Sequence, residues 1–292
     1  MLTKEKFHAL LQQGPLFLDG ATGSNLQKMG MPRGCCTEKW ILENPKALVQ
    51  LQTQYVQAGS NIIYAPTFQA QPIALQKVGL EPQTEAINEQ LVKLSRSVSG
   101  SVLVAGNLTT LATFTDSFDE ENFDLLVENY RRQIKGLLYG GADLLAAETL
   151  MYPTEAEAIL TAAELEGAET VIYTFTMQSD GSLFSGRDAA PVLQELENAG
   201  AAAVGFNCVA ADSMTAGLVS RLKRYVKGPL VCKPNAGIPV IGEDGLPHYP
   251  MSPAEFAEIQ KDCCRMGATI LGGCCGTDPE FIRITKNEIK SL

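Results

Sequence analysis

Three cysteines, placed at the ends of two apolar segments, are the residues of this chain best suited to metal chemistry. The vicinal pair Cys274 and Cys275 follows an apolar run and two glycines, and Cys208 ends the run Ala201–Cys208. A disulfide between adjacent cysteines requires unusual backbone geometry, so it is the weaker interpretation of the pair. Two thiolates joined by a third from elsewhere in the chain would suit one soft cation. The sequence therefore predicts a three-thiolate zinc site.

Composition limits what such a site can be. The chain has eight cysteines but only His8 and His248, so zinc ligands must come mainly from sulfur. Three protein ligands leave a fourth position open, which is typical of catalytic zinc, whereas structural zinc usually closes with four ligands on Cys-x-x-Cys pairs. The sequence contains no such pair. Three thiolates make zinc a weak activator of water, but they allow an incoming thiol to bind deprotonated and remain nucleophilic.

The remaining cysteines are expected to pack rather than bind metal. A lone cysteine is most often a small buried apolar residue, and that alternative stays open for Cys208 taken by itself. Cys232 lies within an apolar run, and Cys263-Cys264 lies within a segment of helical spacing. Cys35-Cys36 follows the first predicted strand, where a metal or redox role is a minor alternative.

Charge and hydropathy exclude several classes of protein. A formal net charge of -10 argues against a nucleic-acid partner, which would require a basic face. No apolar run approaches the roughly 20 residues of a membrane helix. The segment Met1–Phe7 is charged and lacks the apolar core of a signal peptide. We expect a soluble cytoplasmic protein whose cysteines are thiols; the sequence says little about its oligomeric state.

Eight short apolar runs predict buried strands. They are continuous rather than alternating, as in strands that are covered on both faces. The runs are Leu16–Gly20, Asn61–Thr67, Ser101–Asn107, Leu144–Thr149, Thr170–Met177, Ala201–Cys208, Leu230–Gly237 and Ala268–Cys275.

Segments of helical spacing separate these runs. Several begin with proline at the first helical position and several end in glycine. They are Pro45–Ala58, Glu81–Ser97, Glu121–Tyr139, Pro153–Glu166, Ala189–Ala199, Ser213–Val226, Pro253–Met266 and Pro279–Ile289, preceded by a short helix over Lys4–Gln13. Eight alternating units predict an α/β fold, a (β/α)8 TIM barrel forming a single domain over residues 1–292. A doubly wound open sheet competes, but Asp19–Gly23 lacks the Gly-x-Gly-x-x-Gly turn that favours it.

The chemistry of a (β/α)8 barrel lies at the C-terminal ends of its strands. The residues at those ends, in chain order, are Asp19, Thr67, Asn107, Glu148, Thr176, Cys208, Asn235 and Cys274-Cys275. Asp19 and Glu148 could be helix caps or salt-bridge partners, but at a barrel mouth they suit a substrate ammonium. Asn235 could be a turn residue or could donate to a carboxylate, and both alternatives stay open. His248, in a loop, is expected to be solvated.

Several of these motifs resemble the homocysteine S-methyltransferase family. They are Phe17–Gly23, Ala147–Thr149, Gly205–Cys208, Pro234–Gly237 and Gly272–Thr277, in the family's order over essentially the whole chain. The resemblance implies a (β/α)8 barrel with zinc on Cys208, Cys274 and Cys275 and homocysteine sulfur at the open position, giving methionine on methylation. It also implies an acceptor site, for which we expect the residues Asp19, Gly20, Thr67, Glu148, Asn207 and Asn235.

Within that family, Pro234–Pro239 followed by His248–Pro250 is most similar to the homocysteine domain of cobalamin-dependent methionine synthase. There the donor is methylcobalamin on another domain, for which this chain has no residues left, so we expect a separate corrinoid protein at the barrel mouth. One difference is that Gly106–Leu111 lacks the family's usual Gly-Pro element. S-methylmethionine, S-adenosylmethionine or betaine as donor, another thiol as acceptor, and a non-catalytic zinc-binding partner of a corrinoid protein remain alternatives.

Overall fold

Eight parallel strands form the centre of the computed structural model, which describes residues 1–112, 122–178, 180–242 and 247–290. They pair in the order β1-β10-β7-β6-β5-β4-β3-β2, and a parallel bridge between Leu18 and Ile62 joins the two ends into a nearly closed barrel. The strands are β1 Leu16–Phe17, β2 Ile62–Tyr64, β3 Leu103–Thr109, β4 Leu144–Leu150, β5 Val171–Phe175, β6 Ala203–Ala210, β7 Leu230–Asn235 and β10 Ile270–Leu271.

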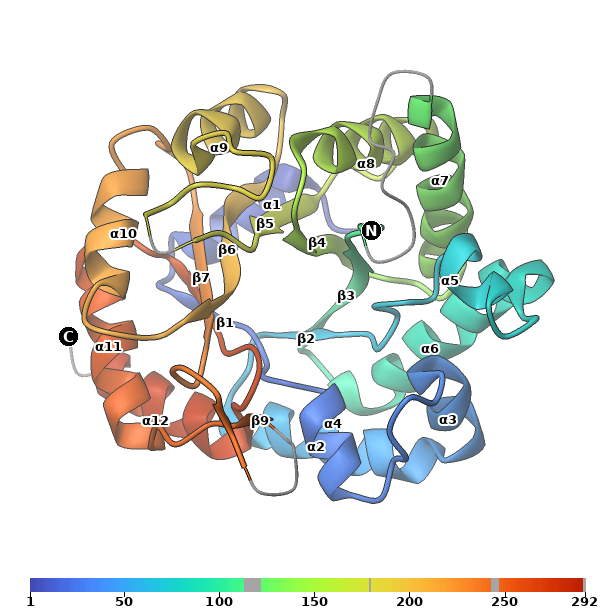
Figure 1. Cartoon of the computed structure of the whole chain (residues 1–292), viewed down its shortest axis with the longest axis horizontal. Coiled ribbons are helices and arrows are strands. Elements are labelled where there is room, and N and C mark those ends of the chain that lie inside the picture. The colour runs from blue at the N-terminus through green and yellow to red at the C-terminus, as the bar shows by residue number, and fades with distance from the viewer. Residues whose placement is uncertain (113–121, 179, 243–246, 291–292) are drawn as a thin grey trace.

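Helices surround the strands on the outside of the barrel (Figure 1). The long ones follow the strands in chain order, as in repeated β-α units. They are α4 Pro45–Ala58, α6 Thr84–Ser99, α7 Phe123–Tyr139, α8 Pro153–Leu165, α9 Ala189–Asn198, α10 Thr215–Leu222, α11 Pro253–Arg265 and α12 Pro279–Lys290. No helix in the described ranges is long and apolar enough to cross a membrane.

Alternation along each strand divides the core into two layers. Side chains such as Leu18, Leu144 and Val231 point into the barrel and pack together, while neighbours such as Leu145 and Cys232 face the helices. Burial of each such aliphatic side chain contributes about 1.5–3 kcal/mol. Continuous apolar runs are therefore what this architecture requires, and the predicted TIM barrel is confirmed; the doubly wound sheet is wrong.

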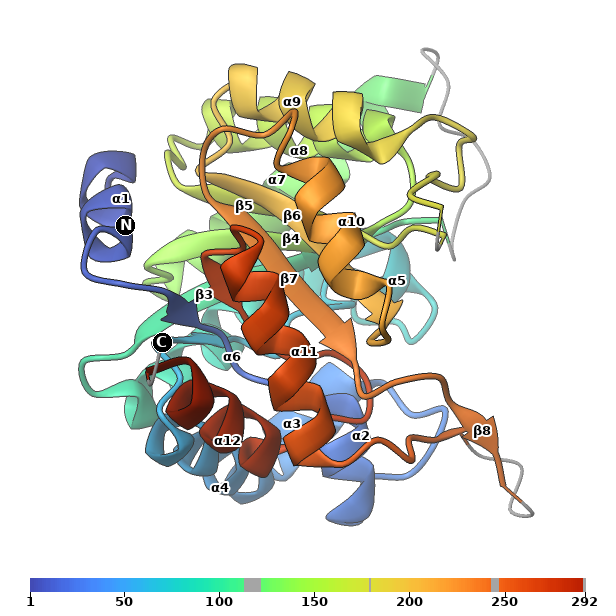
Figure 2. The same cartoon turned by 90° about the vertical axis from the view of Figure 1, so that its left-hand side faces the viewer.

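The short N-terminal helix α1, Lys4–Leu11, closes the end of the barrel opposite the C-terminal strand ends (Figure 2). Phe7 is fully buried in the inner layer. The His8 ring bonds the Ala202 carbonyl at 2.9 Å, and Lys4 Nζ donates to the Gly200 carbonyl at 3.0 Å. Capping of this end leaves the C-terminal mouth as the open face of the barrel.

The loops at the mouth contain elements that the periodicity analysis did not predict. They are the short helices α2 Gly23–Lys28, α3 Thr37–Glu43 and α5 Pro72–Gln76, the 3-10 helix η1 Glu81–Gln83, and the hairpin of β8 Val240–Ile241 with β9 Pro247–His248. Each is too short to give a periodic signal. The predicted helix over Glu81–Ser97 accordingly begins at Thr84, and the predicted first and last strands end earlier than expected. Residue 121, the predicted start of the third long helix, lies outside the described residues.

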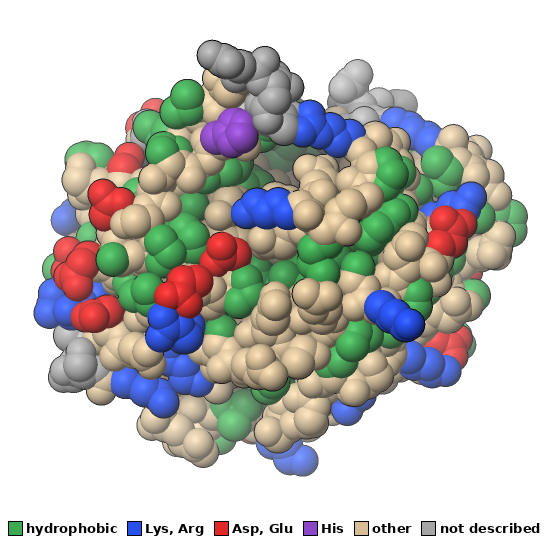
Figure 3. Space-filling model, turned by 90° about the horizontal axis from the view of Figure 1, so that it is seen from below, with side chains coloured by type: hydrophobic (Ala, Val, Ile, Leu, Met, Phe, Trp, Pro, Cys, Tyr) green, Lys and Arg blue, Asp and Glu red, His purple; other side chains and the backbone are tan. Residues whose placement is uncertain are grey.

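The surface shows no field of a single sign on the face drawn in Figure 3. Lysine and arginine side chains lie beside aspartates and glutamates there, among scattered hydrophobic groups. Elsewhere in the described residues, exposed ion pairs include Arg283–Glu280 and Arg265–Asp262. The net charge of -10 is therefore distributed rather than concentrated on that face.

A buried carboxylate anchors the loop that follows β3. Glu155, at the start of α8, is fully buried and accepts hydrogen bonds from the Thr110 hydroxyl at 2.7 Å and the Leu111 amide at 2.6 Å. It also accepts from the amides of Met151 and Tyr152, both at 3.1 Å. One side chain thus satisfies donors from two loops at the mouth. This contact holds Thr110 and Leu111 at the end of β3.

Replacing Glu155 by Ala should leave these buried donors without a hydrogen-bond acceptor. We expect the Glu155→Ala variant to lose about 3 kcal/mol in its free energy of unfolding, because several buried groups lose their partners at once. Glu157, exposed on the same helix, is the matched control, and Glu157→Ala should change stability by about 0.5 kcal/mol or less. Urea unfolding of the three proteins checks this; equal midpoints would contradict the anchoring role.

Candidate metal centre

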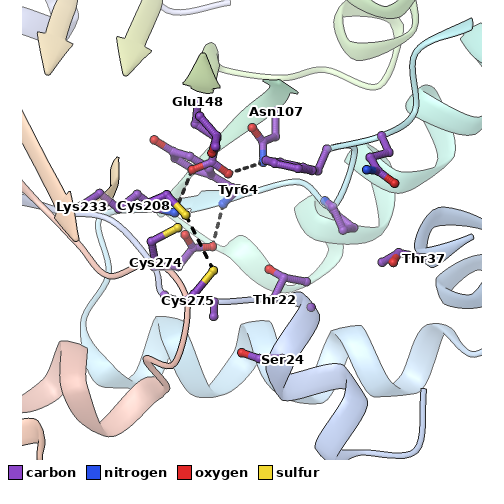
Figure 4. A pocket seen from close by; sticks show the side chains of 18 of the residues that line it. Thr22, Ser24, Thr37, Tyr64, Asn107, Glu148, Cys208, Lys233, Cys274 and Cys275 are labelled. Carbon is purple, nitrogen blue, oxygen red and sulfur yellow. Dashed lines mark hydrogen bonds and ion pairs between the residues drawn. The ribbon is translucent and has the colours of Figure 1, made fainter. Parts of the chain in front are cut away.

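Three sulfur atoms converge at the mouth of the barrel (Figure 4). Cys208 lies in β6, and Cys274 and Cys275 come directly after β10. Their Sγ atoms all lie within 4.8 Å of one another, and those of Cys208 and Cys275 are 4.0 Å apart. Tetrahedral zinc with bonds of about 2.3 Å would set its sulfur ligands about 3.8 Å apart. The cluster therefore fits the ion that the sequence suggested, as free thiols rather than disulfides.

Hydrogen bonds from the end of β7 hold the vicinal pair in place. The Cys274 amide donates to the Pro234 carbonyl at 2.7 Å, and the Ala236 amide donates to the Cys275 carbonyl at 2.9 Å. The Cys275 amide donates to Asn235 Oδ1 at 3.0 Å. The strand between the two cysteine-bearing strands thus continues its pairing past β10. Asn235 thus supports one cysteine of the cluster through its side-chain oxygen.

Irregular backbone aims Cys208 at the pair. Cys208 and Thr149 are the two non-glycine residues with positive φ, 58° and 59°, among the described residues. Both lie where the strand register shifts, in β6 and β4. Such conformations cost about 1–3 kcal/mol each and persist only where surrounding contacts impose them. Asn207 supplies those contacts: its Oδ1 accepts from the Thr149 amide and its Nδ2 donates to the Thr149 hydroxyl, both at 2.7 Å.

The three thiols influence one another's ionisation. Hydrogen bonds from Cys208 and Cys274 lower the pKa of the Cys275 thiol to about 3. The pKa of Cys208 is raised, because its proton is held by the two neighbouring sulfurs. One thiolate is therefore stabilised inside the cluster by its neighbours. A cation would take over that role and accept all three sulfurs as thiolates.

The sulfur cluster opens into a cavity of about 290 Å³. Charged and polar side chains of several strands line it beside the cysteines. They are Asp19, Tyr64, Asn107, Glu148 and Lys233, together with Thr22, Ser24, Thr37, Glu38 and Gln69 from the loops. A cavity of this size suits a small molecule whose thiol reaches the cluster while its polar end meets the strand ends.

Glu148 and Lys233 form a buried ion pair across this cavity. Lys233 Nζ lies 2.9 Å from Glu148 Oε2, and the two side chains are only 4% and 8% exposed. Glu148 Oε1 accepts from Asn107 Nδ2 at 2.8 Å, so both carboxylate oxygens have partners. Burial lowers the pKa of Lys233, but the negative charge of Glu148 and of other neighbouring groups outweighs it, and the pKa lies well above its usual value. Lys233 was missed by the sequence analysis; a lysine inside the apolar run of β7 was the available signal.

Asp19 presents the other carboxylate. Its Oδ2 accepts from the Tyr64 amide at 2.8 Å, while its Oδ1 is buried without a hydrogen-bond partner among the described residues. Burial raises the pKa of Asp19 to about 7, against the lowering effect of Lys233. This carboxyl group therefore has an unused acceptor beside the sulfur cluster.

Two further residues expected in the acceptor site, Gly20 and Thr67, differ in whether they line the cavity. Gly20 lines the cavity, and a side chain there would collide with Tyr55 Oη and Thr277 Oγ1, each 2.7 Å from the added carbon. Thr67 is fully buried behind the cavity wall, where its hydroxyl donates to the Asn107 carbonyl at 2.8 Å. Thr67 is thus placed to support the β3 end rather than to face the cavity.

The cysteines outside the cluster lie as follows. Cys232 and Cys263 are fully buried in the outer core, and Cys264 is half-buried against it, which confirms their packing role. Cys35 Sγ donates to the Pro32 carbonyl, and Cys36 Sγ lies 3.6 Å from a carboxylate oxygen of Glu38, a cavity-lining residue. His248, in β9, is exposed as expected.

Sequence comparisons agree with this geometry. A family profile described as homocysteine S-methyltransferase matches residues 16–289. A homocysteine S-methyltransferase of Escherichia coli strain K12 is 29% identical, with 98% of this chain and 99% of that protein aligned. A methionine synthase of Mycobacterium leprae is 24% identical over 94% of this chain, but the chain spans only 24% of that protein's length.

A solved structure shares the fold. The metallated form of the homocysteine methyltransferase MmuM from Escherichia coli superposes with a TM-score of 0.82 at 26% identity, covering 96% of this chain and 98% of that one. The expectation of a methyltransferase enzyme, which the family resemblance of the motifs implied, is confirmed by these matches. The profile covers nearly the whole chain, and the protein belongs to the homocysteine S-methyltransferase family.

Proposed function

We propose that this protein transfers a methyl group to the thiolate of homocysteine on a zinc ion held by Cys208, Cys274 and Cys275, giving methionine. The observation that carries the proposal is the three-sulfur cluster opening into a cavity with charged side chains. No fourth histidine, cysteine or carboxylate of the described ranges joins the cluster, which supports an open ligand position. That argues against the alternative of a non-catalytic zinc-binding partner.

Zinc bound by three thiolates lowers the pKa of an incoming thiol, so that the acceptor binds as a nucleophilic thiolate without a protein base. The chain's own task is to hold the rest of the acceptor. Asp19 Oδ1, buried and without a partner among the described residues, can accept from the α-ammonium of homocysteine. This contact would orient the acceptor so that its sulfur faces the donor methyl, and exclusion of water would strengthen it.

For the donor we propose a methylcorrinoid protein that docks at the mouth as a separate chain. The similarity of Pro234–Pro239 and His248–Pro250 to methionine synthase homocysteine domains, and the partial-length match to a methionine synthase, support this. In the transfer, the acceptor sulfur forms a bond to the methyl carbon while the cobalt–carbon bond breaks, its electron pair staying on the corrinoid. The product is a thioether, a much weaker zinc ligand than a thiolate, so methionine leaves.

A small-molecule donor is the second candidate. The full-length match to a homocysteine S-methyltransferase, which aligns over 99% of that protein, favours it. S-methylmethionine, S-adenosylmethionine or betaine would enter the same cavity directly. The proposed zinc ligands and acceptor-binding residues are the same for either donor.

The free thiols support a reducing compartment, in keeping with a cytoplasmic location. All eight cysteines are unpaired in the structure. Disulfides persist in oxidising compartments, whereas cytosolic thiols are kept reduced. Oxidation of the cluster would remove the thiolates that the proposed zinc site needs.

Replacing Cys208 tests the metal site directly. We expect Cys208→Ala to bind far less than one equivalent of zinc and to lose methionine formation, because two thiolates no longer hold the ion with a site open for substrate. Cys264→Ala, which changes a half-buried packing cysteine, should keep both. Metal analysis of purified proteins measures the first effect; full zinc content and turnover in the Cys208 variant would refute the site.

A panel of methyl donors tests the donor. Zinc-loaded protein with homocysteine should form labelled methionine from a methylcorrinoid protein and much more slowly from S-methylmethionine, S-adenosylmethionine or betaine carrying the same label. Cys208→Ala serves as the blank for non-enzymatic transfer. Efficient turnover of one small donor, with none from the methylcorrinoid protein, would replace the corrinoid proposal by the second candidate.

The buried Asp19 predicts pH-dependent acceptor binding. Its pKa is raised to about 7, and only the ionised form pairs with an ammonium, so below that pH the affinity for homocysteine should fall by up to about tenfold per unit from this group. Thiol deprotonation adds a slope in every variant. We therefore expect Asp19→Asn to bind more weakly and to show a shallower slope, by up to about one proton, in calorimetric titrations between about pH 6 and pH 8. Equal slopes would remove Asp19 from the acceptor site.

A further inference from the structure

Lys233 carries a positive charge into the centre of the acceptor cavity. The side chain leaves β7, enters the barrel interior, and pairs with Glu148 of β4, three strands along the sheet. Its Nζ lies 5.0 Å from the centre of the Tyr64 ring, from β2. The cation is therefore fixed by contacts from two other strands, beside the cysteine cluster (Figure 4).

Lys233 and Glu148 differ in how many of their hydrogen-bonding positions already have a partner. Both oxygens of Glu148 already accept hydrogen bonds, from Asn107 and from Lys233. Lys233 has three N–H donors, and the described residues accept only the one given to Glu148. It is the single basic residue among the described residues that line the cavity, beside Asp19, Glu38 and Glu148. The ion pair thus leaves spare donors on the cation, whereas each oxygen of its carboxylate already has a partner.

We propose that Lys233 determines acceptor specificity: it takes Glu148 away from the substrate ammonium and presents its remaining N–H donors to the substrate carboxylate. This inference rests on the proposed acceptor site. The ammonium is left to Asp19, whose Oδ1 has no partner among the described residues. An α-amino acid thiol would then place its two charged groups on two different residues. The carboxylate contributes more to recognition than the ammonium, because Lys233 offers it two N–H donors that no described residue accepts, whereas Asp19 offers the ammonium one unpartnered oxygen.

The sequence position of Lys233 explains why it can reach the cavity. In β7, Val231, Lys233 and Asn235 alternate with residues that face the helices, so all three point into the barrel. Val231 belongs to the inner apolar layer, and Asn235 contacts the Cys275 amide at the rim. Lys233 lies between these two levels, where the apolar core ends and the cavity begins.

Two analogues separate the two charges of the acceptor. 4-Sulfanylbutanoate is homocysteine without its ammonium, and homocysteinamide is homocysteine without its carboxylate charge. Binding of both thiols and of homocysteine to the zinc-loaded protein is measured by calorimetry, without any methyl donor. The wild type should bind 4-sulfanylbutanoate more tightly than homocysteinamide.

The Lys233→Met variant should reverse that preference. Its binding of 4-sulfanylbutanoate should weaken by about ten- to hundredfold, the effect of losing a charged hydrogen bond. Homocysteinamide should bind as well or better, because Glu148 becomes free to accept from the ammonium. The double variant Lys233→Met with Glu148→Gln removes both charges of the ion pair, so that neither is left unpaired. It should lose the preference for the carboxylate analogue without gaining affinity for the ammonium analogue. Zinc content and thermal unfolding verify that each variant is folded and loaded.

The outcomes are separable. Equal weakening of all three thiols in both variants would show that Lys233 only supports the structure and would overturn the inference. Homocysteine binding with an unchanged ratio between the analogues would overturn it while leaving the proposed function intact. Failure of the zinc-loaded wild type to bind homocysteine at all would refute the proposed acceptor and, with it, this assignment of Lys233.

Discussion

Parallel pairing of β6, β7 and β10 is the constraint on which the site depends. Residues more than 60 positions apart meet only because β7 bonds to both neighbours and fixes their register, with Phe206 opposite Cys232 and Cys232 opposite Leu271. The pairing continues past the last regular residue of β10, through the Cys274 amide and the Pro234 carbonyl. A slip of one residue in either pair would turn a sulfur toward the helices.

Above this frame the polar groups form one connected network. Asn207 holds the Thr149 backbone, Asn107 holds Glu148, and Glu148 holds Lys233 across the barrel. Each buried charge is paired or bonded, as low-dielectric surroundings demand. Two acceptors beside this network, Asp19 Oδ1 and Asn107 Oδ1, are buried without a partner among the described residues. Unpartnered buried acceptors at the wall of a cavity are the feature expected of a binding site rather than of a core.

Much of this could be predicted from the sequence, for a physical reason. Parallel strands of a barrel end on the same side, so Cys208, Cys274 and Cys275 could be brought together from strand order alone. The Lys233–Glu148 pair could not, because it joins β7 and β4, which are not neighbours in the sheet, and strand order says nothing about contacts through the interior. The alternatives for Asn235 were likewise undecided by residue type: a side-chain oxygen that accepts from the Cys275 amide becomes visible only with coordinates. The short helices α2, α3 and α5 lack enough turns to show a period.

The left-handed backbone at Cys208 favours glycine over cysteine at this position. Glycine adopts that conformation without steric cost, whereas most side chains do not. Glycine is therefore the substitution at residue 208 that would best relieve the backbone strain, but it would remove the thiol. The cysteine at this strained position is therefore explained by its place in the three-sulfur cluster and not by a preference of the backbone.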